Sequence, residues 1–141
     1  MKTIETTSGR RIMGKLDHGA DLLESLTSVC GDNGIRLGRV EAIGAMQNAV
    51  TGFYNQESRE YEYQEIDKPV ELLALVGNVS LKDGEPIVHA HVTLSDSDGN
   101  AIGGHLGPGT IVFACDFMIE EFHGEDLSRG MDEETGLPLW Q

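Results

Sequence analysis

One segment of the chain, Asp17 to Gly31, carries apolar residues at helical spacing. These residues fall at i, i+1, i+4, i+7 and i+8, which places them on one face at 3.6 residues per turn: Leu22, Leu23, Leu26, Val29 and Cys30. Asp17 or Asp21 can cap the first turn, and Gly31 or Gly34 can supply the left-handed stop. The pattern predicts a helix with one apolar side, which we expect to lie on a flat surface.

After the helix, residues 37–119 show the shorter apolar runs and turn signals of strands. The predicted strands are Leu37–Met46, Val50–Tyr54, Glu60–Asp67, Val70–Val76, Ile87–Leu94, Ala101–Leu106 and Thr110–Ile119. The run Val70–Val76 is continuous enough to predict a strand that is buried on both faces. With a single N-terminal helix, these strands indicate an α+β fold with a mainly antiparallel sheet, forming one domain over residues 1–141.

The charge balance excludes several classes of function. The chain has 10 Lys+Arg against 24 Asp+Glu, a formal net charge of −14. Binding to nucleic acid or to an anionic membrane depends on basic residues that face the phosphates, so we expect neither from this chain. Residues 116–134 are especially acidic and contain Arg129 as their only basic residue.

The N-terminal residues lack the apolar core of a secretory signal, and no apolar run approaches the roughly 20 residues that span a bilayer. We therefore expect a soluble protein in the cytoplasm. Cys30 and Cys115 lie far apart and outside any C-x-x-C unit. This spacing speaks against a disulfide framework or a zinc ribbon, and both residues are expected to be small buried side chains.

Three of the five histidines lie between residues 89 and 105. His89 and His91 are two positions apart, so on a strand both project from the same side. Asp98-Gly99 is a turn signal that returns the chain as a hairpin. In a hairpin the residue numbers of paired positions add to a constant. If that constant is 194 or 196, His105 is paired with His89 or His91 and lies on the same face. An odd sum requires a bulge at Gly103-Gly104 to turn His105 toward them.

Three histidines on one side of a hairpin match the ligand set of a catalytic-type zinc site, in which a further position stays open. A metal there can polarise a carbonyl group or activate water. His89, His91 and His105 are therefore the predicted ligands of a divalent metal ion, with zinc as the first choice. Glu71 and Glu41 are weaker candidates for a fourth ligand or a general base.

Several segments together resemble the plant and prokaryote conserved (PPC) domain family. The hairpin around His89-Ala-His91 and Ile102–Leu106 is preceded by Val70–Asn78, as in that family. Leu16–Leu26 is similar to its L-x-x-G-E-D-L-L-x-x-L helix entry, and Ala42–Ala45 to its A-I-G-A strand. Arg129 with Asp132–Leu137 is similar to its closing segment. The order and spacing of these segments carry the resemblance over nearly the whole chain.

The resemblance implies an α+β domain that assembles as a homotrimer, in a family generally described as DNA-binding. Plant members contact DNA through a separate basic AT-hook, and no R-G-R-P core occurs in this sequence. Prokaryotic members that keep the three histidines resemble this chain more. The fold also looks similar to that of acetolactate decarboxylase, whose zinc sits on an H-x-H hairpin plus a third histidine.

Three functions follow as hypotheses. The first is a metal-binding domain that acts in regulation or assembly. It binds other copies of itself in a trimer, and a partner protein or a small molecule. The second is a zinc-dependent, decarboxylase-like enzyme for a small carbonyl or carboxylate substrate. The third is a purely structural trimer without metal. The residues favour the first and leave the others open.

Overall fold

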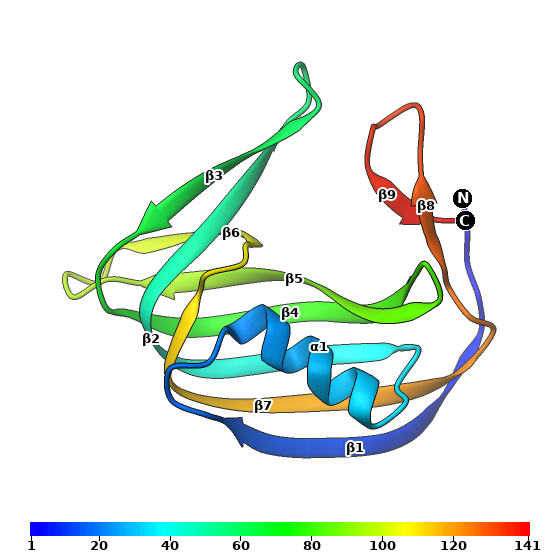
Figure 1. Ribbon diagram of the computed structural model, residues 1–141, viewed down its shortest axis with the longest axis horizontal. Coiled ribbons are helices and arrows are strands. Elements are labelled where there is room, and N and C mark those ends of the chain that lie inside the picture. The colour runs from blue at the N-terminus through cyan, green and yellow to red at the C-terminus, as the bar shows by residue number, and fades with distance from the viewer.

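The computed structural model describes residues 1–141 and shows one helix lying against a curved antiparallel sheet (Figure 1). The elements in chain order are β1 (Thr6–Leu16), α1 (Leu22–Asp32), β2 (Gly38–Asn55), β3 (Glu60–Ile66), β4 (Val70–Lys82), β5 (Glu85–Ser95), β6 (Ala101–Leu106), β7 (Ile111–Gly124), β8 (Arg129–Met131) and β9 (Pro138–Trp140). The α+β class with a mainly antiparallel sheet and an N-terminal helix is thereby confirmed.

The main sheet has the strand order β1-β7-β2-β4-β5-β6, with β3 paired to β2. Strand β2 is long enough to pair with four other strands. Its first half pairs with β7 and β4, and its second half pairs with β3 and with β6 through Thr51↔Leu106 and Gly52↔His105. Strands β2, β4, β5 and β6 therefore close into a ring, and the β2–β3 arm projects beyond it (Figure 1).

The helix is shorter at its start than the spacing of apolar residues predicted. The carboxylate of Asp21 accepts a hydrogen bond of 2.9 Å from the backbone N–H of Glu24, so Asp21 is the N-cap and the helix begins at Leu22. Residues 17–20 form a turn instead of a first helical turn. After the helix ends at Asp32, Gly34 adopts a left-handed conformation with a φ of 64°, as predicted for the stop.

A core of 23 buried residues lies between α1 and one face of the sheet. Leu22, Leu26 and Cys30 provide the helix side of this core. Both cysteines are buried and free, which confirms their predicted role as small core side chains. No helix of the chain is both long and apolar enough to cross a membrane.

The opposite face of the sheet is open, and this corrects one prediction. Val70–Val76 was expected to be buried on both faces, but Leu73 and Val76 are 51% and 53% exposed. The side chains of this strand alternate, because only the face toward α1 is covered by the chain itself. Residues paired directly across strands share a face. The row Met13–Met118–Glu41–Val76–His91 therefore places apolar side chains and a predicted metal ligand on the same open face.

Candidate metal centre

The hairpin of β5 and β6 brings the three predicted histidines together on the open face. His91 is paired directly with His105, so the residue numbers of paired positions add to 196. This is one of the two predicted registers in which the three histidines share a face. His89 lies two residues from His91 and is paired with Asn78 of β4. Gly103 and Gly104 form no bulge in this register.

The three imidazoles form a compact cluster. One nitrogen from each of His89, His91 and His105 lies within 4.8 Å of the other two. The ring centroids are 5.4 Å apart for His89 and His91, 5.1 Å for His89 and His105, and 5.6 Å for His91 and His105. His91 is exposed, whereas His89 and His105 are half-buried. The arrangement offers three nitrogen ligands and leaves one side of the cluster facing outward.

Burial disfavours the charged form of two of these rings. It lowers the pKa of His89 to about 4, with a further contribution from the positive charge of Arg129. Burial also lowers the pKa of His105. A neutral imidazole has one nitrogen with a free lone pair, which is the form that binds a metal. The Nδ1 atom of His105 is buried and has no hydrogen-bond partner. An unpartnered buried nitrogen is costly, so this donor set fits a metal ion better than it fits isolated histidines.

Arg129 of β8 lies directly beside the cluster. Its Nη2 is 3.3 Å from Nδ1 of His89 and 2.9 Å from Oδ1 of Asn78, and its Nε donates to Oγ of Ser80 at 2.9 Å. Its Nη1 donates to the carbonyl of Pro138, and the guanidinium lies 5.5 Å from the ring centre of Trp140. All its hydrogen-bond acceptors are uncharged. Burial lowers the pKa of this arginine, which forms no ion pair with a carboxylate.

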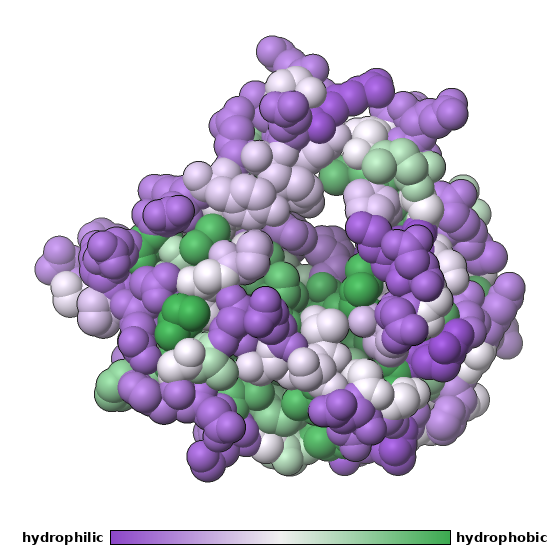
Figure 2. Space-filling model, viewed as in Figure 1, coloured by the Kyte–Doolittle hydropathy of each residue, from purple (hydrophilic) through white to green (hydrophobic).

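The β2–β3 arm covers the other side of the cluster. The ring of Tyr61 in β3 lies 4.7 Å from that of His105, centroid to centroid. The hydroxyl of Tyr54 donates to the carbonyl of Thr135, and Arg59 donates to the carbonyls of Glu133 and Glu134, which ties the arm to the loop between β8 and β9. Figure 2 shows a hollow between the arm and this C-terminal hairpin. The histidines lie between the arm and the C-terminal hairpin, because Tyr61 of the arm lies against His105 and Arg129 of the hairpin contacts His89.

The two glutamates proposed as a fourth ligand or base do not join the cluster. Glu41 lies on the same cross-strand row as His91 but two strands away, and it forms an ion pair with Arg39. Glu71 is exposed and lines a separate cavity of about 790 Å³. Both carboxylates lie outside the group of three imidazoles.

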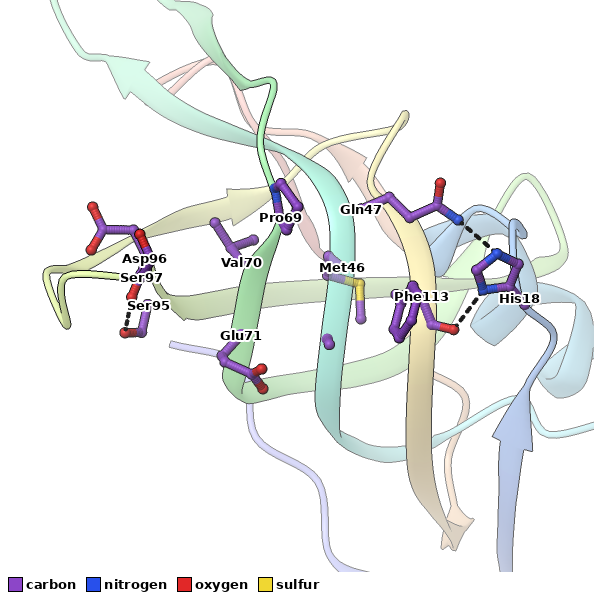
Figure 3. A pocket seen from close by; sticks show the side chains of 11 residues that line it. His18, Met46, Gln47, Pro69, Val70, Glu71, Ser95, Asp96, Ser97 and Phe113 are labelled. Atoms are coloured by element: carbon purple, nitrogen blue, oxygen red, sulfur yellow. Dashed lines mark hydrogen bonds between the residues drawn. The ribbon is translucent and has the colours of Figure 1, made fainter.

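That separate cavity also contains His18 (Figure 3). Nδ1 of His18 lies 2.8 Å from the carbonyl oxygen of Phe113, which can only accept, so Nδ1 carries the proton. His18 and His123 do not belong to the cluster. The cavity and the cluster are therefore two different places on the molecule.

The residues around the cluster were harder to find in the sequence than the ligands. Arg129 had two signals: its position as the only basic residue within the acidic segment 116–134, and its place in the closing segment that resembles the PPC family. Tyr61 had none, because its alternation with Tyr63 and glutamates indicates a strand and nothing more. Asn78 was named only as the end of the segment Val70–Asn78 that resembles the family, and Ser80 carries no motif.

The fold and the site define a small α+β domain with a three-histidine cluster on the open face of its sheet. Comparison with known protein families identifies the family of this domain. The sequence matches the Plants and Prokaryotes Conserved (PCC) domain over residues 3–123, and the chain belongs to this family. The resemblance seen in its motifs is thereby confirmed.

Solved structures from archaea and bacteria share this fold. A metal-containing protein from Archaeoglobus fulgidus is 42% identical, with a TM-score of 0.95 and coverage of 100% of this chain and 99% of that chain. A plant- and prokaryote-conserved (PPC) protein from Pyrococcus horikoshii is 36% identical, with a TM-score of 0.94 and coverage of 100% and 97%. A candidate DNA-binding protein from Ralstonia eutropha is 26% identical, with a TM-score of 0.81 and coverage of 92% and 89%.

A longer protein also contains a similar segment. The bifunctional protein GlmU from a Synechococcus strain is 28% identical over 124 residues, which cover 86% of this chain. The matched segment is only 18% of the length of that relative. The similarity therefore concerns one part of that protein.

Proposed function

We propose that this protein is a metal-binding member of its family, in which His89, His91 and His105 hold one divalent cation, with zinc as the first choice. The observation that carries the proposal is the approach of three imidazole nitrogens to within 4.8 Å of one another, with Nδ1 of His105 buried and unpartnered. Zinc is bound well by neutral imidazole. The description of the Archaeoglobus fulgidus relative as metal-containing supports the same proposal.

Metal analysis of protein purified without a histidine tag tests this proposal. We expect about one equivalent of zinc per chain after loading and removal of unbound metal. His91→Ala should lose it, because two imidazoles bind zinc far more weakly than three. His91 is exposed, so its replacement should leave the fold intact. His18→Ala removes an exposed histidine outside the cluster and should keep the full equivalent. Equal metal content in the wild type and His91→Ala would contradict the proposal.

Regulation or assembly is the role we assign to this metal-binding domain, and a metal-dependent enzyme is the second candidate. The enzyme hypothesis is favoured by the position of the histidines between the β2–β3 arm and the β8–β9 hairpin, where Tyr61 lies against His105 and Arg129 contacts His89. A bound metal would polarise a carbonyl or carboxylate group of a small substrate there. Arg129 and Tyr61 would form the walls that orient the substrate and restrict water.

We further propose that the chain assembles as a homotrimer through its open sheet face. Leu73, Val76, Ile43, Phe113 and Met118 are exposed on strands β2, β4 and β7, and contiguous exposed apolar residues are typical of protein interfaces. Sedimentation equilibrium should give a mass close to three times the 15.3 kDa of the chain. Val76→Glu should shift the mass toward a single chain. A wild-type mass of one chain would contradict this assembly.

Direct DNA binding is not part of the proposed function, although a relative from Ralstonia eutropha is described as a candidate DNA-binding protein. The net charge is −14, and six of the ten basic residues are held in ion pairs with carboxylates. We expect no retardation of duplex DNA in gel-shift experiments at physiological salt. Salt-sensitive binding with a slope of several phosphates would overturn this expectation.

A further inference from the structure

Arg129 is the unusual charge of this molecule. It is a half-buried cation in a chain of net charge −14, yet no carboxylate pairs with it. Four other arginines are paired with carboxylates: Arg10, Arg11, Arg36 and Arg39. A charge that is taken out of water is costly unless an opposite charge or good hydrogen bonds compensate for it. Hydrogen bonds to uncharged partners are the only compensation for the charge of Arg129, so an anion beside the histidines would meet an unpaired positive charge.

The contact between Arg129 and His89 conflicts with metal binding. A guanidinium has only N–H donors, so Nδ1 of His89 must accept the bond from Nη2. A neutral imidazole has one lone pair, and a metal ion needs that lone pair as well. In ordinary metal sites the second nitrogen of a histidine instead donates to a carboxylate or carbonyl. Binding of a metal by His89 must therefore release one N–H of Arg129 close to the metal.

Other features of the site suit an organic anion. One further N–H of Nη1 is free, because a terminal guanidinium nitrogen carries two protons and Nη1 makes a single hydrogen bond, to Pro138. The guanidinium is held in place by Asn78 and Ser80, so its donors are already oriented. Trp140 stands over Arg129 and Tyr61 over His105, and their rings offer contacts to a carbon skeleton.

We propose that the metal-loaded histidine cluster and Arg129 together bind the carboxylate group of a small organic acid, with Arg129 as the residue that selects an anion. This inference rests on the proposed metal site. The carboxylate oxygens would accept hydrogen bonds from the released N–H of Nη2 and the free N–H of Nη1 while the carboxylate group lies on the outward side of the cluster. A guanidinium fork matches the planar geometry of a carboxylate. Metal and carboxylate should then bind cooperatively, because the metal releases the donor that the carboxylate needs.

Acetate is a suitable probe, and acetamide is its uncharged counterpart of similar shape. Trp140 is the only tryptophan and lies against Arg129, so its fluorescence reports binding at this place. We expect acetate to change this fluorescence in zinc-loaded protein at constant ionic strength, and acetamide to have no effect. Metal-free protein should bind acetate at least tenfold more weakly. Inorganic phosphate that binds more tightly than acetate would overturn the assignment to a carboxylate.

Two variants with the same change in charge separate the role of Arg129 from general electrostatics. Arg129→Gln should weaken acetate binding at least tenfold while keeping one zinc per chain. Arg11→Gln removes an exposed, ion-paired arginine elsewhere and should bind acetate as the wild type does. If Arg129→Gln does not fold by circular dichroism, Arg129→Lys keeps the charge without the fork and should show a smaller loss.

The outcomes also separate this inference from the proposed function, because zinc content is measured on the same samples. Wild-type protein that holds no zinc overturns both. Zinc-loaded protein that does not distinguish acetate from acetamide overturns only the inference about the anion. Equal acetate affinity of the wild type and the folded Arg129 variant would also overturn only the inference about the anion.

Discussion

Zinc at a hundredfold excess over its dissociation constant should raise the free energy of unfolding by about 2.7 kcal/mol. The three imidazoles are brought together only by the register of β5 and β6, so the unfolded chain has no equivalent site. A ligand that binds the folded state alone stabilises it by mass action. Urea denaturation with and without zinc measures the effect, and a chelator should reverse it.

Two controls make this result specific to the cluster. His91→Ala should show almost no stabilisation by zinc, because one of its three nitrogen ligands is missing. Calcium should not stabilise the wild type, since it prefers oxygen ligands and the cluster contains none. An unfolding curve of the wild type that zinc leaves unchanged would contradict the metal site.

Gly103→Ala should destabilise the protein by about 1 to 3 kcal/mol and weaken zinc binding roughly tenfold. A Cβ atom at Gly103 would lie 2.3 Å from the carbonyl oxygen of Val92, which is far inside contact distance. Because that oxygen is backbone, strands β5 and β6 must move apart to make room. His105 lies two residues along β6 and would move with it. Thermal unfolding and zinc titration measure the two effects.

A matched glycine tests whether the effect comes from this close approach. Gly31 lies in α1, and a Cβ added there meets nothing within 4 Å. Gly31→Ala should leave zinc binding unchanged and stabilise the protein slightly, because alanine favours a helix. If Gly103→Ala is as stable as the wild type and binds zinc equally well, the close packing of β6 does not position His105.

The sequence contained enough information for the histidine cluster because two local rules determine it. Alternation along β5 puts His89 and His91 on one face, and a short turn at Asp98-Gly99 determines which residues of β6 stand opposite. Each rule acts within one hairpin of 17 residues, from His89 to His105. The single helix was found for the same reason, although its start was misplaced because two aspartates could serve as the cap.

Features that depend on distant segments could not be read in the same way. Strand β1 was not predicted, because this edge strand is mostly exposed and its sequence has little alternation. The predicted strands Leu37–Met46 and Val50–Tyr54 are one strand, β2, held together by pairing with partners far along the chain. Arg129 reaches His89 from 40 positions away through a small C-terminal hairpin. No pattern within the neighbourhood of either residue indicates such a contact.

The apolar residues of β4 show how a local rule can mislead. A continuous run of apolar residues predicts burial on both faces, and within one chain Leu73 and Val76 are exposed. The pattern of residues does not say whether the second face is covered by the same chain or by another copy. The proposed homotrimer would cover this face and account for the apolar run.

Anomalous diffraction at the zinc absorption edge, on crystals of untagged protein, would locate the metal at the histidine cluster directly. We expect one strong peak per chain among His89, His91 and His105, about 2.0 to 2.1 Å from one nitrogen of each ring. Crystals of His91→Ala grown under the same conditions should lack the peak. A wild-type map with no peak among the three rings, or with its zinc bound elsewhere, would contradict the proposed metal site.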